Sequence, residues 1–179
     1  RHTRYISVTG VQTCALPIFR QGLSYFTMTA ERLRDIFYGH EGNEIHKWDH
    51  YFEIYERYLG HLCGTDATML EIGIAQGGSL QMWRKYLGDK ARIFAIDVNP
   101  DSAKVAGDAT AFIGSQSDRE FLKSVRAELP ELDVVIDDGG HTMDQQKASF
   151  EVLFSKVRQG GYYIVEDTHT SYWREYYGG

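Results

Sequence analysis

Two apolar runs that end in paired acids constrain the fold of this chain more than any other feature. The first covers Asp133–Asp138 and continues through two glycines to His141, and the second covers Tyr162–Asp167. Such runs are typical of parallel strands whose two faces are both buried. Ligands of open α/β sheets bind at the carboxyl ends of the strands, so we expect these carboxylates and one imidazole to converge. The sequence therefore predicts a hard-metal site with a base beside it.

A glycine-rich turn follows an earlier apolar run. Met69–Ile72 reads as a strand, Gly73 and the pair Gly77-Gly78 come next, and Ser79 begins a segment of helical periodicity. Glycine lets the backbone approach a ligand closely and take a positive φ, and we expect the Ser79 side chain to cap the helix. The following run, residues 92–97, ends in an acid that could accept hydrogen bonds from both hydroxyls of a ribose. Together these segments predict a nucleoside pocket.

The spacing of the glycines distinguishes between two nucleoside ligands. A dinucleotide fingerprint reads G-x-G-x-x-G, whereas here three residues separate Gly73 from Gly77-Gly78. Glu71 stands just before the turn, where a carboxylate would repel a pyrophosphate but suits a ligand with an ammonium or sulfonium centre. The pattern therefore favours S-adenosylmethionine over NAD, and a methyltransferase over a dehydrogenase.

Several segments together resemble a known family. They are Leu70–Trp83, Ile113–Asp118, Ile136–His141 and Val165–Trp173, and His46–Glu56 is similar as well. They look like class I S-adenosylmethionine-dependent methyltransferases, above all the metal-dependent, mycinamicin-type sugar O-methyltransferases of macrolide biosynthesis, the rhamnosyl O-methyltransferases and their cephalosporin hydroxylase-like relatives. The resemblance covers about residues 40 to 173. It implies a Rossmann-like, doubly wound parallel sheet of the α/β class, preceded by N-terminal helices.

The resemblance also implies roles for individual residues. It places a magnesium ion on Asp138, Glu166 and Asp167, and makes His141 the base that removes the proton of the acceptor. The residues it assigns to the S-adenosylmethionine site are Glu71, Gly73, Gly77, Ser79, Asp97, Gln116, Ser117, Asp118 and Asp137. One departure is that Gly140 stands where the family pattern has serine, which removes a hydroxyl but neither proposed catalytic group.

The expected chemistry is O-methylation. Alcohols are poor nucleophiles at neutral pH; a divalent cation lowers the pKa of a bound hydroxyl, and an imidazole can accept its proton. Oxygen ligands favour magnesium. We therefore expect an S-adenosylmethionine-dependent, magnesium-assisted O-methyltransferase that acts on a hydroxyl of a sugar or a glycosylated natural product. The alternatives are a methyltransferase of small polyols or catechols, and a binding module that senses S-adenosylmethionine without chemistry.

Several of these residues have structural alternatives. Asp137 either belongs to the site or caps a loop or helix, and His141 could instead cap the following helix. His169 is either a second base or ligand or an ordinary loop histidine. The aromatic residues of the helix expected over about residues 47–59 are expected to pack in the core, although Tyr51 could reach the cofactor. Tyr172 and Trp173 either line an acceptor site or pack under a loop.

Composition excludes several classes of protein. The net charge of −6, without a basic stripe, argues against a nucleic-acid partner. No apolar run is long enough to span a membrane. Cys14 and Cys63 do not make a disulfide framework, which fits a reducing cytoplasm. The expected partner is a small-molecule hydroxyl acceptor, and the resemblance allows a homo-oligomer.

Helices and strands alternate along the chain. We expect helices over about residues 29–38, 47–59, 79–87, 118–129 and 143–157, and strands over about 67–74, 92–97, 111–113, 134–137 and 162–166. The last helix is expected to end at Gln159–Gly161, with an inner face on or near which lie Phe150, Val152, Leu153, Phe154 and Val157. Alternation of this kind predicts a parallel sheet with helices on both faces.

The chain is expected to have three parts. Residues 1–26 read as a non-native or disordered leader, because residues 1–18 resemble translated sequencing-adaptor read-through. Residues 27–66 form an N-terminal helical segment, and residues 67–179 form the S-adenosylmethionine-binding domain. We expect that domain to be a fragment, truncated after its fifth strand, because a helix and an antiparallel hairpin usually follow that strand in sheets of this type.

Overall fold

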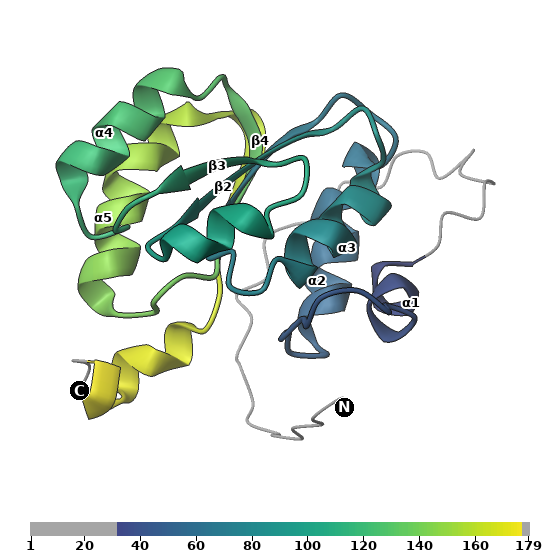
Figure 1. The fold of residues 1–179 in the computed structure, drawn as a ribbon, viewed down its shortest axis with the longest axis horizontal. Helices are drawn as coiled ribbons and strands as arrows, with labels where there is room; N and C mark the ends of the chain where they lie inside the picture. Colours follow the sequence, from purple (N-terminus) through teal and green to yellow (C-terminus); the bar gives the residue numbers. More distant parts are fainter. Residues whose placement is uncertain (1–31, 177–179) are drawn as a thin grey trace, which may run out of the picture. The chain divides into compact units, whose positions relative to one another are not determined.

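A computed structural model describes residues 32–176, and the expected leader and the start of the first predicted helix lie outside these residues. After the N-terminal helix pair, five strands alternate with three further α-helices and short 3₁₀ turns (Figure 1). The helices are α1 (Leu33–Tyr38), α2 (Tyr51–Leu59), α3 (Gly78–Leu87), α4 (Arg119–Glu128) and α5 (Met143–Leu153). The strands are β1 (Thr68–Ile72), β2 (Arg92–Asp97), β3 (Thr110–Ile113), β4 (Leu132–Asp137) and β5 (Val157–Val165).

The strands form one parallel sheet in the order β3-β2-β1-β4-β5. The order reverses direction beside β1, because β2 and β3 lie on one side of it and β4 and β5 on the other. In open α/β sheets a ligand crevice opens at this switch point. The predicted α/β, doubly wound, Rossmann-like fold is confirmed. Every residue of β1 and β4 is buried, as expected for central parallel strands.

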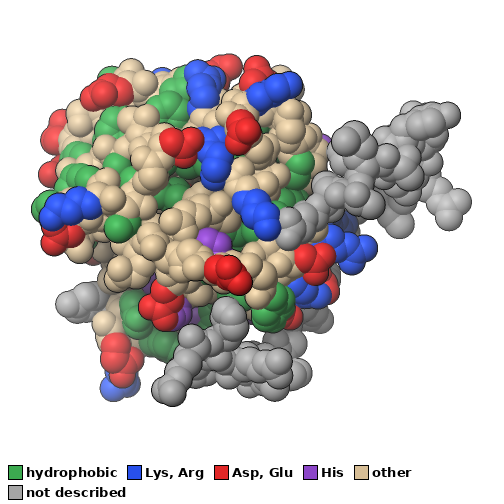
Figure 2. Space-filling model, turned by 45° about the vertical axis from the view of Figure 1, so that its right-hand side comes forward, with side chains coloured by type: hydrophobic (Ala, Val, Ile, Leu, Met, Phe, Trp, Pro, Cys, Tyr) green, Lys and Arg blue, Asp and Glu red, His purple; other side chains and the backbone are tan. Residues whose placement is uncertain are grey.

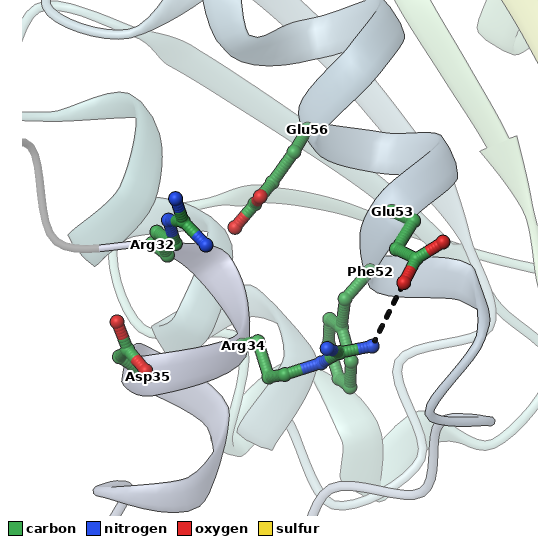
Figure 3. Close-up of a pocket in the computed structure, with 6 residues that line it drawn as sticks. All are labelled: Arg32, Arg34, Asp35, Phe52, Glu53 and Glu56. Carbon is green, nitrogen blue, oxygen red and sulfur yellow. Dashed lines mark ion pairs between the residues drawn. The ribbon is translucent and has the colours of Figure 1, made fainter.

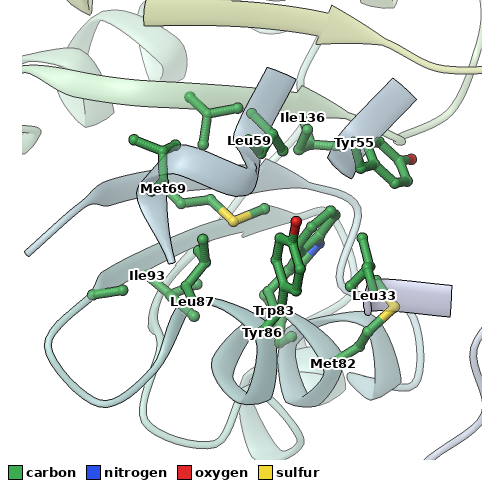
Figure 4. Packing of buried hydrophobic residues seen from close by; sticks show 14 of the residues in the cluster. Leu33, Tyr55, Leu59, Met69, Met82, Trp83, Tyr86, Leu87, Ile93 and Ile136 are labelled. Atoms are coloured by element: carbon green, nitrogen blue, oxygen red, sulfur yellow. The ribbon is translucent and has the colours of Figure 1, made fainter. Parts of the chain in front are cut away.

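One face of the sheet packs against the N-terminal helices and α3 (Figures 1 and 4). The apolar side of α3 contributes Met82, Trp83 and Leu87, all fully buried. The Trp83 ring lies edge-on to Tyr55 of α2, with ring centroids 5.1 Å apart. The expected packing of the α2 aromatic residues in the core is confirmed for Phe52 and Tyr55, and this contact fixes α2 against the same face as α3.

The opposite face of the sheet is covered by α4 and α5 (Figure 1). Leu122 and Val125 of α4 and Leu153 of α5 are buried against the sheet. The start of α5 carries a capping box in which Thr142 and Gln145 bind each other's backbone N–H groups. This cap fixes the point at which the chain leaves the loop that follows β4.

Three local predictions were wrong. Helix α2 begins at Tyr51, four residues after the predicted start. Helix α5 ends at Leu153, and Gln159–Gly161 lie inside β5, where a register shift between β4 and β5 accommodates Gly160 in the left-handed region at φ +83°. Phe150 and Phe154 are about half exposed, because the helix ends early and they pack on each other and on Tyr163.

The surface of the described residues carries mixed charge. Figure 2 shows acidic and basic side chains interspersed over the visible face rather than gathered by sign. Among the described residues, no helix combines the length and the apolar character needed to cross a bilayer.

Candidate active site

The register of the sheet aligns the carboxyl ends of its central strands. Ile72 at the end of β1 pairs with Asp137 at the end of β4, and Asp137 pairs with Val165 at the end of β5. The residues that follow these strands therefore leave the sheet at one level. Gly73 comes after β1, Asp138 after β4, and Glu166 and Asp167 after β5.

Asp138, His141 and Asp167 come together at this edge. Nε2 of His141 lies 3.7 Å from Oδ1 of Asp138 and 3.6 Å from Oδ2 of Asp167. One ligand atom from each of these residues lies within 4.8 Å of the others. All three side chains are about one-fifth exposed, so the group opens to the surface. The other ring nitrogen of His141, Nδ1, is buried and has no hydrogen-bond partner among the described residues.

The backbone of His141 is held in an unusual conformation. Its φ is +59°, in the left-handed region, and its carbonyl oxygen accepts a hydrogen bond from the Thr170 hydroxyl at 2.7 Å. His141 does not cap helix α5, because Thr142 does. The left-handed turn directs the imidazole back towards the strand ends.

Glu166 lies on the interior side of this group. Its Oε1 accepts hydrogen bonds from Nζ of Lys47 at 2.8 Å and from the hydroxyl of Tyr55. The side chain is only 3% exposed, and burial raises the pKa of its carboxyl although Lys47 acts in the opposite direction. The structure therefore places Asp138 and Asp167 with His141, and Glu166 behind them.

Lys47 was missed by the sequence analysis. Its ammonium is fully buried and lies 2.6 Å from Oδ2 of Asp138, 2.8 Å from Glu166 and 3.6 Å from Glu71. Burial opposes its charged form, but the neighbouring carboxylates outweigh burial and raise the pKa of Lys47. No local signal identifies it, because its partners lie far away in the sequence and lysine is seldom buried.

Asp167 is also bound by residues around the start of α2. Its Oδ1 accepts hydrogen bonds from Nε1 of Trp48 at 2.8 Å and from the hydroxyl of Tyr51 at 2.9 Å. Tyr51 therefore contacts an acid of the group. His169 has one ring nitrogen 3.9 Å from the same oxygen, while Tyr172 and Trp173 are exposed.

The glycine turn has the close approaches that its sequence predicts. Gly73 has φ +99°, and a Cβ there would come within 2.1 Å of the carbonyl oxygen of Asp138. Gly77 has φ +79° and a similar conflict with Val105. Side chains at these positions would push apart the loops that follow β1, β2 and β4, so both glycines are needed for the turn to close.

Glu71 and Ser79 form an interior pair. Glu71 is fully buried; its Oε2 accepts a hydrogen bond from the Ser79 hydroxyl at 2.8 Å, and its Oε1 accepts one from Nε1 of Trp83 at 3.1 Å. Burial raises the pKa of this carboxyl. The expected capping of α3 by Ser79 is wrong, because the N-cap is Gly77 and the Ser79 hydroxyl turns to Glu71.

Asp97 stands at the end of β2 and holds the glycine turn. Its Oδ2 accepts hydrogen bonds from the backbone N–H groups of Ile74 and Ala75, and its Oδ1 accepts one from Asn99. The side chain is partly exposed at the surface of the turn. Asp97 thus connects the two loops expected to surround a ribose.

The remaining predicted cofactor residues brace the loops that follow β3 and β4. Gln116 is buried, donates hydrogen bonds to Asp137 and Ser149, and accepts one from the N–H of Gly140. Asp137 is buried as well, and burial raises the pKa of its carboxyl to about 6. Ser117 is exposed and its hydroxyl contacts that of Ser115, whereas Asp118 is the N-cap of α4.

A separate pocket lies between α1 and α2 (Figure 3). It has a volume of about 310 Å³, and Arg34 faces Glu53 across it at 3.7 Å. None of the residues predicted for the site lines it. Its lining residues are Arg32, Arg34, Asp35, Phe52, Glu53 and Glu56.

Comparison with known proteins identifies the family. The family model described as a methyltransferase domain matches residues 70–168, which include the glycine turn and the acids that follow β4 and β5, Asp138, Glu166 and Asp167. The chain belongs to this methyltransferase family. The expected class I fold and the resemblance to mycinamicin-type enzymes are confirmed by the relatives and solved structures that follow.

Two curated relatives are sugar O-methyltransferases. The 8-demethyl-8-(2-methoxy-α-L-rhamnosyl)-tetracenomycin-C 3′-O-methyltransferase of Streptomyces olivaceus is 36% identical over 146 residues, which cover 78% of this chain. The L-olivosyl-oleandolide 3-O-methyltransferase of Streptomyces antibioticus is 35% identical over 145 residues, or 75% of this chain. This chain spans 37% of the length of each relative.

A solved structure has the same fold as this methyltransferase domain. It is the MycE methyltransferase of the mycinamycin biosynthetic pathway, in complex with Mg, SAH and mycinamycin VI. The match has a TM-score of 0.71 at 29% identity and covers 84% of this chain and 40% of the other.

Proposed function

We propose that this methyltransferase domain transfers the methyl group of S-adenosylmethionine to a hydroxyl of a sugar on a glycosylated small molecule. The observation that carries the proposal is the convergence of Asp138, His141 and Asp167 beside the glycine turn. The names of the relatives support it, because they describe O-methyltransferases that act on a rhamnosyl and an olivosyl compound.

In this proposal His141 is the general base. A sugar hydroxyl must lose its proton before or during attack on the methyl group, and an imidazole near neutral pH can accept it. The two carboxylates beside Nε2 would stabilise the imidazolium that forms, since each lies within 3.7 Å. The backbone hydrogen bond from Thr170 would hold the ring in place during the transfer.

The donor set fits a magnesium ion. Oδ1 of Asp138 and Oδ2 of Asp167 both lie within 3.7 Å of Nε2 of His141, and their hydrogen bonds to the described residues are made through the other oxygen of each carboxylate. Oε2 of Glu166 is a candidate third ligand, because the contacts of this side chain are made through Oε1. When bound, the ion would supply a positive charge that acidifies and orients the acceptor hydroxyl. Magnesium in the MycE complex supports this assignment.

We propose that the cofactor lies over the glycine turn. Gly73 and Gly77 would let the turn close against the neighbouring loops to form the cofactor site, and Asp97 would contact the ribose. Ser117 has an exposed side chain, and its hydroxyl would contact the adenine. Glu71, Ser79, Gln116, Asp118 and Asp137 would act mainly by holding these loops, because their polar atoms already contact protein groups. Such an enzyme would act in the cytoplasm.

A methyl-transfer assay tests the proposal. Purified protein is incubated with labelled S-adenosylmethionine and with mycinamycin VI or L-olivosyl-oleandolide as the acceptor. We expect label in an acceptor, loss of transfer with EDTA, and recovery when magnesium is added back. His141→Asn should lower turnover about 100-fold or more, as for loss of a general base, and leave cofactor affinity nearly unchanged. Asparagine tolerates the left-handed backbone at this position.

Three results would count against the proposal. Binding of S-adenosylmethionine without transfer to either acceptor would favour a binding module that carries out no methyl transfer. Transfer that persists in EDTA would rule out the proposed role of the metal ion. Unchanged turnover of His141→Asn would rule out His141 as the general base.

A further inference from the structure

A segment made of the loop just before α2 and the first turns of that helix directs a row of hydrogen-bond donors at the acids. Lys47 donates to Asp138 and Glu166. Trp48 and Tyr51 donate to Asp167, and Tyr55 donates to Glu166. The donors stand at positions 47, 48, 51 and 55, a spacing that places side chains on one side of a helix and its N-terminal extension. Asp138, Glu166 and Asp167 therefore each have at least one partner on this segment.

The donors leave a defined pair of oxygens available. Asp138 is held through Oδ2 and presents Oδ1 to His141, while Asp167 is held through Oδ1 and presents Oδ2. Without these contacts, each carboxylate could rotate about χ2 and turn its free oxygen away from the imidazole. The segment thus fixes the planes of both carboxylates so that one oxygen of each faces His141.

The contact between Tyr51 and Asp167 is reciprocal. The Tyr51 hydroxyl donates to Oδ1 of Asp167 at 2.9 Å and accepts a hydrogen bond from the backbone N–H of the same residue at 3.0 Å. Asp167 itself has φ +53°, in the left-handed region. One hydroxyl therefore fixes both the backbone and the carboxylate of a residue whose conformation is otherwise unfavourable.

We propose that Lys47, Trp48 and Tyr51 are positioning residues that orient Asp138 and Asp167 for a divalent cation, an inference that rests on the proposed function. Residues that hydrogen-bond metal ligands orient them, and their loss typically weakens metal binding or activity 10–100-fold. Here the orienting groups come from a segment far from the acids in sequence, so α2 is part of the site rather than only of the core.

Tyr51→Phe tests the inference directly. The substitution removes both hydrogen bonds to Asp167 and keeps the aromatic ring. We expect the dissociation constant for Mg²⁺, measured by calorimetry in the presence of S-adenosylhomocysteine, to rise about 10-fold or more. Affinity for S-adenosylhomocysteine itself should change less than about twofold, since Tyr51 is not placed against the glycine turn.

Tyr58→Phe is the matched control. Tyr58 lies on the same helix, is 39% exposed and packs on the ring of Tyr162, away from the acids. Its Mg²⁺ affinity should equal that of the wild type. If Tyr51→Phe does not fold, Trp48→Phe replaces it, because it removes a single donor to the same oxygen.

The outcomes separate the inference from the proposed function. Suppose that the wild type binds Mg²⁺ and that Tyr51→Phe, or Trp48→Phe if that variant is used, has the same dissociation constant. This result would overturn the positioning role and leave the proposed function intact. Wild-type protein that binds no Mg²⁺ would overturn the metal site and, with it, this inference. A selective loss of Mg²⁺ affinity, absent from Tyr58→Phe, supports both.

Discussion

At the scale of single residues, the site depends on how each carboxylate shares its two oxygens. Asp138 and Asp167 each bind protein donors through one oxygen and face His141 with the other. Carboxylates that meet at one edge would repel one another without a cation. The buried Lys47 partly balances Glu71, Asp138 and Glu166, and the outward-facing oxygens of Asp138 and Asp167 are the ones left for an ion.

Asp137 provides a prediction about pH at this scale. Burial raises the pKa of its carboxyl from 3.8 to about 6, which corresponds to roughly 3 kcal/mol. Between pH 3.8 and about 6 the folded state binds more protons at Asp137 than the unfolded state does. The free energy of unfolding therefore falls as the pH rises through this range, and Asp137 causes little further loss of stability above it. Asp137→Asn should therefore gain stability relative to wild type by roughly 2 kcal/mol between pH 4 and 7.

Urea unfolding of both proteins at the two pH values measures this difference. Asparagine can still accept the hydrogen bond from Gln116, and any offset common to both pH values cancels in the comparison. A stability difference between variant and wild type that stays constant from pH 4 to 7 would show that Asp137 titrates normally in the folded protein.

At the scale of elements, one residue predicted for the cofactor site also caps a helix. Asp118 caps α4 by accepting hydrogen bonds from the N–H groups of Glu120 and Phe121. Asp118→Ala should lower the free energy of unfolding by about 1 kcal/mol, the usual cost of losing an N-cap, and Asp118→Asn should restore most of it. Chemical denaturation of the three proteins measures both effects. Equal stability of Asp118→Ala and wild type would contradict the capping role.

The sequence predicted the elements that carry strong periodic or positional signals. The glycine turn and the acids after β4 and β5 were located correctly because strand ends in a parallel sheet lie at one edge. The end of α5 was placed too late, because Gln159–Gly161 resembles a helix end but forms an irregular part of β5. Propensity alone does not separate a C-terminal helix signal from a strand bulge.

The sequence could not predict contacts that depend on tertiary packing. Lys47 and Tyr51 reach the acids only because α2 folds over the ends of β4 and β5, more than a hundred residues away for Glu166 and Asp167. For Glu71, Gln116 and Asp118 the structure adds protein partners that the motif reading did not include. Their proposed part in cofactor binding stays a prediction.

At the scale of the whole molecule, one parallel sheet brings all these parts together. The order β3-β2-β1-β4-β5 places the glycine turn of β1 directly beside the acids of β4, and β5 adds Glu166 and Asp167 at the same edge. Helices on both faces bury the strands, so the strand ends are held at fixed spacing. The fold thus supplies a rigid frame in which loops carry the chemistry.

Calorimetric titration of Mg²⁺ into the protein, with S-adenosylhomocysteine present, tests the central claim most directly. Wild-type protein should bind about one ion per chain, and Asp138→Asn and Asp167→Asn should each weaken binding at least about 10-fold, because each removes a charged ligand. Absence of Mg²⁺ binding in the wild type, or variants that both bind Mg²⁺ as tightly as the wild type, would contradict the account.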